Sequence, residues 1–480
     1  MKDFATVIID MLEGKVDYGD VRVVQKMEEH IVVKNGKVES ISSAEDLGFG
    51  VRVMINGFWG FASSNRLDIL TAEQVVRRAI ETAKAAAIAG GNPLSLAPED
   101  PYIDSYSTPY QKDPFDIPIT DKIELLMKVD ELLAREKKVR LRVASTRAYR
   151  TYKVFASTEG SIIEQEIVEC GAGYTAFAMD RGELQKRSYP GAFGGNVATA
   201  GWEFVEEMEL EKHAPRVAEE AVKLLTAPPA PAGELDLVIG TNQMALQVHE
   251  SIGHAVELDR VLGFEASYAG TSFATIDKLG NFRYGSPLMN VYADATTPRG
   301  LGTFGYDDEG VPAQRVPIVK EGILVGYLSS RDTAPAIGRR SSGAARASSW
   351  NRIPIVRMTN INLEPGDLSF EELIADVEDG LFIDTNKSWS IDQKRLNFQF
   401  GTEIGWRIKH GKLTEIVRDP VYTGITPQFW ASLDGVGDSS TWELWGVPNC
   451  GKGEPGQSMH VGHGVPVARF RKVKVGSKGF

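Results

Sequence analysis

Residues 20–64 alternate between apolar and polar side chains, as strands with one buried face do. Two Asn-Gly pairs interrupt the alternation, within KNGK at 34–37 and INGF at 55–58. Asn-Gly suits two-residue hairpin turns, because both residues tolerate positive φ angles. The pattern therefore predicts an antiparallel sheet that is folded through two hairpins.

Segments whose apolar residues have helical spacing flank these strands. Residues 1–15 predict an amphipathic helix, since the stretch carries acidic residues and lacks the cleavage site of a signal peptide. A second helix is predicted from an N-cap at Thr71 to a stop at Gly90. The first block is therefore expected to be a sheet covered by helices.

A similar order of elements follows a polar, proline-rich linker at 91–118. A helix is predicted from Thr120 to about Glu136, and two long strands at 139–158 and 161–180. One further helix is predicted over 202–225.

A second proline-rich linker, TAPPAPAGE at 226–234, precedes the last block. That block is predicted to begin with a strand at 235–240 and a helix at 241–262. The remainder is rich in loops and strands, with one isolated helix from a cap at Ser369 to a stop at Gly380.

The two linkers predict an N-terminal α+β region at 1–225 and a C-terminal domain at 233–480. The N-terminal region is expected to have sub-blocks of about 1–95 and 112–225, each with antiparallel sheet and covering helices. The C-terminal domain is expected to be mainly antiparallel sheet that carries the helix at 241–262. The fold class is therefore α+β.

The composition makes several classes of protein unsuitable for this chain. With 42% hydrophobic and 25% charged residues, the 480-residue chain has an ordinary globular composition, and its two cysteines exclude a disulfide scaffold. A cytoplasmic protein is expected, and no apolar run is long enough for a membrane helix. The net charge of −12 disfavours direct nucleic-acid binding. The most basic segment, RRSSGAAR at 339–346, is interpreted as a solvated loop.

The helix at 241–262 carries the main candidate chemistry, HESIGH, in which His249 and His254 stand five residues apart. On a regular helix that spacing turns the two side chains about 140° apart, so they could not share one ion. A π-helical turn or a break between them would bring them together. Gly253 favours such a distortion, since glycine tolerates backbone angles that strain other residues. Thr241 or Asn242 is expected to cap the helix.

Glu250 follows the first histidine and would reach the open position of a bound zinc ion rather than the ion itself. There it could take a proton from water and pass it to a leaving amine. The spacing leaves the third ligand open. The candidates are Glu257 and Asp259 on the same helix, and Cys450, His460 and His463 in a Gly/Pro-rich segment at 445–466.

Each of these residues also has an ordinary structural interpretation. A His-Glu…His pattern on an amphipathic helix is more often a packing or surface feature than a metal site. A lone cysteine is more often an inert buried residue than a ligand. The remaining histidines, His30, His213 and His410, are assigned no function.

Several segments together resemble the TldD/PmbA family of metallopeptidases, once called modulators of DNA gyrase, and in particular its TldD branch. They are GFGVRVMINGFWGFASS (48–64), HESIGHAVELD (249–259), FGYDDEGVPAQR (304–315), MTNINLEPGD (358–367) and NCGKGEPGQSMHVGHG (449–464). The resemblance covers nearly the whole chain.

The resemblance implies one Zn²⁺ per chain, bound by His249, His254 and Cys450, with Glu250 as the catalytic base. It leaves His460 and His463 as candidates for substrate or transition-state contacts. It also implies a dimer, either of this chain alone or with a PmbA-type subunit, that trims leader peptides and degrades small unstructured proteins. An extended substrate would pair with an exposed sheet edge.

Two other functions fit the sequence. One is a non-catalytic binding or scaffold protein, a regulator partner whose metal site is structural or vestigial. The other is a metal-dependent amidase that acts on small substrates. A fourth protein ligand would favour the first, while an open position beside Glu250 favours an enzyme.

Overall fold

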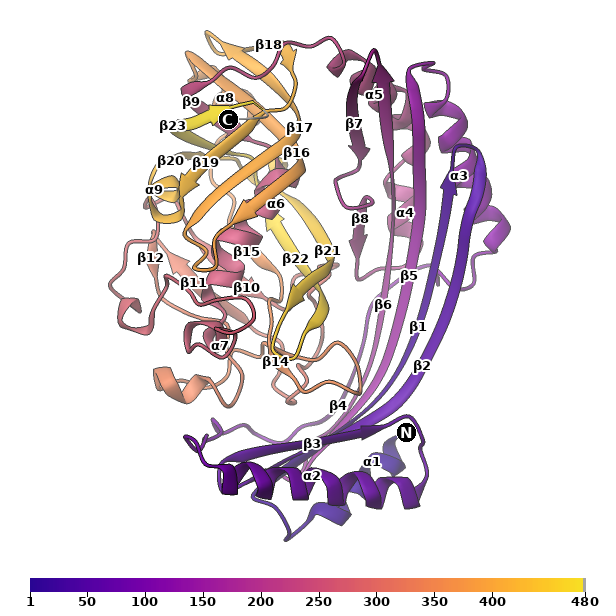
Figure 1. Ribbon diagram of the computed structural model, residues 1–480, viewed down its shortest axis with the longest axis vertical. Coiled ribbons are helices and arrows are strands. Elements are labelled where there is room, and N and C mark those ends of the chain that lie inside the picture. Colours follow the sequence, from indigo (N-terminus) through magenta and orange to yellow (C-terminus); the bar gives the residue numbers. More distant parts are fainter. Residues whose placement is uncertain (478–480) are drawn as a thin grey trace.

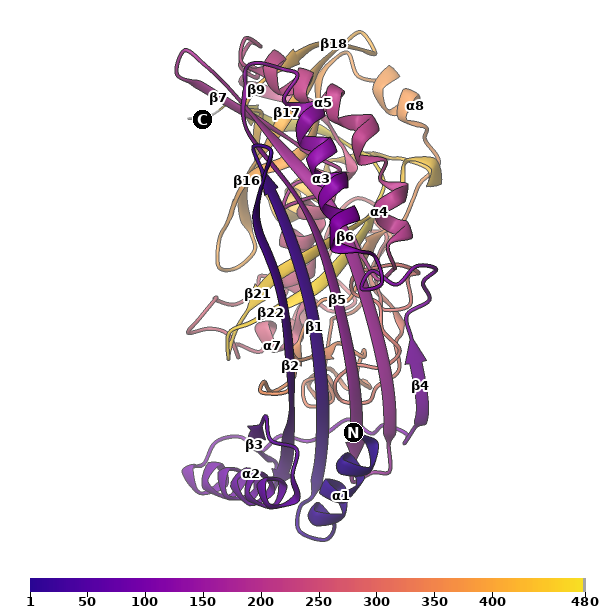
Figure 2. The same ribbon diagram turned by 90° about the vertical axis from the view of Figure 1, so that its right-hand side faces the viewer.

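The computed structural model describes residues 1–477, and its N-terminal half forms one eight-stranded sheet (Figure 1). The strands are β1 (Tyr18–Lys34), β2 (Lys37–Ile55), β3 (Phe58–Ser64), β4 (Ile103–Ser107), β5 (Val139–Ser157), β6 (Ile162–Asp180), β7 (Glu183–Tyr189) and β8 (Asn196–Ala198). Four of them, β1, β2, β5 and β6, are 17 to 19 residues long and lie side by side in Figure 2. At ~3.3 Å per residue, they form a blade roughly 60 Å in length.

Both predicted hairpins are present. Asn35 and Gly36 join β1 to β2, with φ of 48° and 70°, and Asn56 and Gly57 join β2 to β3, with φ of 53° and 80°. Positive φ at both turn positions is what two-residue hairpins require, so the Asn-Gly pairs set the register of the blade.

Helices cover the two ends of the blade (Figure 1). Helices α1 (Lys2–Leu12) and α2 (Ile69–Ala89) pack on one end, and α3 (Ile119–Leu133), α4 (Glu203–Glu207) and α5 (Leu210–Leu224) pack on the other. Strand β1 lies between β2 and β5, so the two N-terminal segments share a single sheet although each end has its own apolar core.

Some local predictions are wrong. The linker at 91–118 contributes strand β4, which pairs with β6 in parallel. The single helix predicted at 202–225 is divided at Glu209, whose φ is 44°. Helix α2 is capped by the side chain of Asp68, which accepts from Thr71 N–H, so Thr71 is not the cap. Strand β3 ends at Ser64, four residues before Asp68, so only a short loop connects β3 to α2.

The C-terminal half is built around a seven-stranded sheet and a smaller four-stranded sheet. The first contains β9 (Gly233–Ile239), β16 (Asp379–Ile391), β17 (Asn397–Lys409), β18 (Lys412–Val417), β19 (Val421–Ile425), β20 (Leu433–Val436) and β23 (Ala468–Gly476). The second contains β10 (Val291–Asp294), β11 (Arg315–Lys320), β12 (Ile323–Leu324) and β15 (Ile361–Leu363). The mixed α+β fold, rich in antiparallel sheet, is as predicted.

Shorter elements complete this half. They are the helices α6 (Thr241–Val248), α7 (Leu258–Val261), α8 (Phe370–Ala375) and α9 (Thr426–Ala431), the strand pair β13 (Ala345–Arg346) and β14 (Ile355–Val356), and the hairpin β21 (Glu443–Lys452) with β22 (Gln457–Val465). Ser369 caps α8 as predicted, through a capping box, but the helix ends at Ala375, and Gly380 is not its stop because it lies in β16. One apolar core joins α6 to both sheets and to the hairpin.

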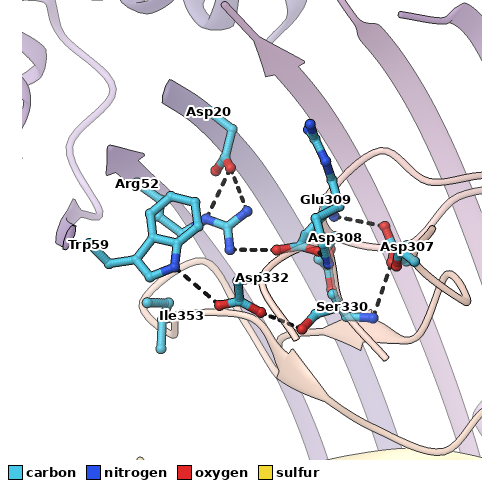
Figure 3. Close-up of polar contacts among 12 residues, drawn as sticks. Asp20, Arg52, Trp59, Asp307, Asp308, Glu309, Ser330, Asp332 and Ile353 are labelled. Atoms are coloured by element: carbon cyan, nitrogen blue, oxygen red, sulfur yellow. Dashed lines mark hydrogen bonds and ion pairs between the residues drawn. The ribbon is translucent and has the colours of Figure 1, made fainter. Parts of the chain in front are cut away.

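A buried ion-pair network fixes the blade against the C-terminal half (Figure 3). Arg52 of β2 donates to Asp20 at 2.6 Å and to Glu309 at 2.8 Å, and all three side chains are almost fully buried. Lys153 of β5 lies 2.7 Å from Asp308. Asp308 and Glu309 belong to the FGYDDEG segment at 304–310, so that segment joins the two halves of the molecule.

No helix within residues 1–477 combines the length and the apolarity needed to cross a membrane.

Candidate metal centre

A widened helical turn brings the two histidines of HESIGH together. Helix α6 starts after Gly240, its N-cap, rather than at a side-chain cap on Thr241 or Asn242, and it passes at His249 into a π-helical turn that ends at Gly253. The backbone N–H of His254 donates to the carbonyl oxygen of His249, a hydrogen bond that spans five residues. The two imidazole rings consequently lie with centroids 4.9 Å apart.

Side chains from elsewhere in the fold stabilise this turn. Tyr284 donates its hydroxyl to the carbonyl oxygen of Ser251, and Trp430 donates its indole N–H to Oγ of Ser251 at 2.9 Å. Gly253 adopts ordinary helical angles (φ −48°, ψ −60°), so the predicted need for unusual backbone angles is wrong. A Cβ at Gly253 would instead lie 2.3 Å from Sδ of Met358, and close packing explains the glycine.

Cys450 reaches the histidines from the β21–β22 hairpin. Its Sγ lies 3.4 Å from Nε2 of His249 and 3.5 Å from Nε2 of His254, and the three donor atoms all lie within 4.8 Å of one another. Arg357 donates to the carbonyl oxygens of Cys450 and Gln457, which holds this end of the hairpin in place.

Hydrogen bonds on the side of each ring away from Cys450 set the tautomers of His249 and His254. Nδ1 of His463 lies 3.2 Å from the carbonyl oxygen of Ile361, so it donates there and leaves its Nε2 as an acceptor. That Nε2 lies 2.8 Å from Nδ1 of His249, which must therefore carry the proton. Nδ1 of His254 donates likewise to Oε2 of Glu257 at 2.8 Å. Both imidazoles keep the Nε2 lone pair free for a metal.

The charge states favour metal binding as well. Burial lowers the pKa of His249 and brings the pKa of His254 and of His463 well below the usual value, so burial disfavours the protonated form of each ring. At Cys450 burial acts to raise the pKa of the thiol, but His254 and Arg357 outweigh it and the pKa is lowered. Neutral imidazole and thiolate are the forms that bind zinc.

The donor set fits a zinc ion. Tetrahedral zinc, with Zn–N of about 2.0–2.1 Å and Zn–S of about 2.3 Å, separates nitrogen from sulfur by about 3.5 Å. The two sulfur–nitrogen distances of 3.4 and 3.5 Å agree with that value.

Glu250 lies beside these donors in a cavity of about 410 Å³. One carboxylate oxygen, Oε2, accepts from Nη1 of Arg395. The cavity is lined by Phe193, Leu246, His249, Glu250, His254, Trp389, Ser390, Ile391, Arg395, Val447, Asn449, Cys450 and Gly451. Phe193 and Trp389, which are 37% and 48% exposed, pack edge to face at this cavity. An apolar surface is therefore available next to the candidate site.

The other candidate ligands lie elsewhere. Glu257 accepts from His254, and Asp259 lies 2.6 Å from Nζ of Lys452, so both carboxylates already have partners, and neither belongs to the group of donor atoms formed by His249, His254 and Cys450. His460 projects from the opposite face of β22, where its Nδ1 lies 2.7 Å from Glu169 of the blade. That face lines a separate cavity of about 510 Å³.

His463 is fully buried, and its two ring nitrogens contact His249 and the backbone of Ile361. A substrate contact, which the sequence left open for His463, would require this packing to open. No pattern in the sequence indicated that Arg395 would contact Glu250, because 145 positions separate them.

The basic segment at 339–346 is not a uniformly solvated loop. Arg339 and Arg340 are exposed, and Arg340 pairs with Glu99 and Asp100 of the linker. The second part of the segment is largely buried and ends in β13. The prediction of a solvated loop therefore holds only for its start.

A buried His₂Cys donor set beside a carboxylate and an open cavity is an arrangement that could hold a metal ion with a position left for water, as a metallopeptidase requires. Family models for the three domains of the PmbA/TldA metallopeptidases match this chain: domain 1 at residues 19–87, the central domain at 112–227 and the C-terminal domain at 232–477. The chain belongs to the PmbA/TldD family of metallopeptidases, and the resemblance inferred from the sequence is confirmed.

Curated relatives extend over almost the whole chain. A protein of Methanothermobacter thermautotrophicus named metalloprotease is 32% identical over 99% of this chain and 98% of its own length. A Haemophilus influenzae protein named metalloprotease TldD homolog is 28% identical and covers 98% of this chain and 95% of its own.

Solved structures share the fold. A Thermotoga maritima protein described as a modulator of a DNA gyrase matches with a TM-score of 0.77 at 18% identity, over 98% of this chain and 99% of its own. TldE from Thermococcus kodakarensis matches with a TM-score of 0.75 at 15% identity, over the same fractions.

Proposed function

We propose that this chain is a zinc-dependent peptidase that cleaves unfolded or extended peptides, with one Zn²⁺ held by His249, His254 and Cys450. The observation that carries the proposal is the convergence of three donor atoms within 4.8 Å of one another beside Glu250. The hydrogen bonds that fix both Nε2 lone pairs support it, because packing alone does not require those tautomers.

Glu250 is the proposed general base. A zinc ion bound there would polarise the peptide carbonyl and make an attacking water more acidic. The carboxylate of Glu250 takes a proton from that water while the water oxygen bonds to the carbonyl carbon. Glu250 then returns the proton to the amide nitrogen as the C–N bond breaks, so water is added across the peptide bond.

An unpaired edge of β16 supports binding of an extended substrate. Strand β9 pairs with β16 only at Gly380–Ile383, whereas β17 accompanies β16 as far as Ile391. Within the described residues, the other edge of residues 388–391 has no strand partner, and Trp389 and Ile391 line the cavity. A peptide could add to this edge through its backbone, which tolerates many sequences. This mode suits leader-peptide trimming and the degradation of small unstructured proteins.

The assembly and the location are also proposals. Membership of a family that includes TldE-type chains supports a dimer, either of this chain alone or with a PmbA-type subunit. The cytoplasmic location stays a prediction from composition, as does the absence of direct nucleic-acid and membrane partners.

The rival function, a non-catalytic binding or scaffold protein, would be favoured by a fourth protein ligand. His463 lies behind His249 and His460 faces the other cavity, so neither supports a closed site. The cavity of about 410 Å³ and the adjoining strand edge also favour a peptide over the small substrate of an amidase.

The test is a zinc assay combined with peptide turnover in the parent, in Glu250→Gln and in a control, Glu415→Gln, at an exposed position on β18. We expect about one zinc per chain in all three proteins, and cleavage of an unfolded peptide in the parent and the control only. Turnover by Glu250→Gln at the parent's rate would exclude Glu250 as the base. A zinc-loaded parent that cleaves no peptide would favour the scaffold function.

A further inference from the structure

Arg395 lies at the candidate site and makes few hydrogen bonds of its own. Its guanidinium lines the cavity beside Glu250, and its side chain is 16% exposed. Within the described residues, Nη1 donates to Glu250, and Nε is buried without a hydrogen-bond partner. By contrast, the buried Arg331 uses its donors on Glu159 and on the carbonyl oxygen of Ala97.

The backbone at Arg395 is held firmly in the turn between β16 and β17. Arg395 N–H donates to the carbonyl oxygen of Asp392, and Thr426 donates its hydroxyl to the carbonyl oxygen of Arg395 at 2.8 Å. The carboxylate of Asp392 accepts from the backbone N–H groups of Leu396 and Asn397. The turn therefore presents the guanidinium to the cavity from a fixed position, which is what electrostatic stabilisation of a transition state needs.

We propose that Arg395 stabilises the oxyanion that forms when water attacks the peptide carbonyl. The inference rests on the proposed peptidase function and adds a second catalytic residue to it. As the water oxygen bonds to the carbonyl carbon, the carbonyl π electrons move to oxygen, and Glu250 takes the proton. The negative charge thus leaves Glu250 and appears on the substrate oxygen.

Arg395 has a charge partner throughout this step. Before the attack its partner is the Glu250 carboxylate, as in the structure. After the attack Glu250 is neutral, and the guanidinium, which has five N–H donors, can donate to the new oxyanion. A cation beside the base therefore does not oppose proton transfer, because the same cation stabilises the charge that the transfer creates.

The experiment compares the parent with Arg395→Ala, Arg395→Lys and a matched control, Lys394→Gln. Lys394 is exposed in the same turn, and its substitution removes the same charge. The readouts are zinc content, kcat and KM for an unfolded peptide, and calorimetric affinity for a phosphinic peptide, whose anionic phosphinyl group imitates the tetrahedral species. Substrate affinity without turnover is measured for the same peptide in the Glu250→Gln background.

For Arg395→Ala we expect full zinc content, a kcat lower by about 10²- to 10³-fold, and phosphinic-peptide affinity reduced by a similar factor. Substrate affinity in the Glu250→Gln background should change little. Methylguanidinium added to Arg395→Ala should restore part of both kcat and phosphinic-peptide affinity. Arg395→Lys keeps the charge but not the planar donors, so an intermediate loss is expected. Lys394→Gln should match the parent.

Three results would overturn the inference while leaving the peptidase function intact. One is an Arg395→Ala enzyme with the parent's kcat. Another is an equal loss of substrate and phosphinic-peptide affinity in both Arg395 variants, since uniform binding does not accelerate the chemical step. Loss of zinc or of the fold in both variants would also count against it, because Arg395 would then be structural. A parent that neither cleaves peptides nor binds the phosphinic peptide would instead refute the proposed function.

Discussion

Replacing His463 by leucine is expected to weaken zinc binding although His463 does not face the metal. The substitution removes the acceptor that lies 2.8 Å from Nδ1 of His249, in a position that is fully buried. A buried N–H left without a partner costs about 1–3 kcal/mol. In the metal-free protein His249 can move its proton to Nε2, which lies 3.4 Å from Sγ of Cys450, and so reduce that cost. Zinc on Nε2 forbids this tautomer.

The cost therefore appears mainly in the zinc-loaded state. At 0.59 kcal/mol for RT, about 1–3 kcal/mol corresponds to a roughly 5- to 150-fold increase in the zinc Kd. The usual effect of removing such an outer partner, about 10- to 100-fold, lies within this range. His463→Gln keeps an acceptor oxygen, so its zinc affinity should fall less than that of His463→Leu.

The assay is a competitive zinc titration of metal-free protein against a chromophoric chelator. His460→Gln is the matched control, since it removes an imidazole from the same strand on the face toward Glu169. Thermal unfolding of the metal-free proteins shows whether the fold is kept. If His463→Leu binds zinc as tightly as the parent, or if His460→Gln loses as much affinity, the tautomer argument is wrong.

Three further predictions concern ligation, packing and the interface. Cys450→Ser should lose zinc on dialysis against a chelator, as measured by metal analysis, and full occupancy would remove Cys450 from the ligand set. Gly253→Ala should lower the free energy of unfolding by about 1–3 kcal/mol, measured by thermal unfolding, because the new Cβ would lie 2.3 Å from Sδ of Met358. Adding Met358→Val to this variant should recover part of the loss. Burial acts to raise the pKa of Asp308, but Lys153 and a nearby arginine outweigh it and hold the pKa at about 2. The ionised Asp308 carboxylate therefore adds about 2–3 kcal/mol to the free energy of unfolding above pH ~4, and this contribution is lost as the pH falls towards 2. The urea midpoints of Asp308→Asn and of the parent should converge over that pH range. A difference in midpoint that stays constant with pH would contradict the low pKa of Asp308.

The sequence alone determined those elements that depend only on residues near one another in the chain. The Asn-Gly pairs at 35–36 and 56–57 fixed two hairpins, because only a few residues accept the positive φ values found there. The spacing of His249 and His254 required an irregular helix if both were to bind one ion, and the π-helical turn has that form. The family resemblance supplied Cys450, which spacing alone could not choose among the candidates.

Long-range contacts lay beyond the reach of the sequence. A pattern in the chain cannot show that His463 would lie behind His249, 214 positions away, or that Arg395 would contact Glu250. The same is true of β4, whose short polar stretch becomes a strand because β6 offers it an edge. Periodicity and turn chemistry act between neighbours along the chain, so they set the elements. The proton positions and charges at the candidate site depend on which distant side chains the packed core brings within hydrogen-bonding distance, and only the tertiary structure decides that.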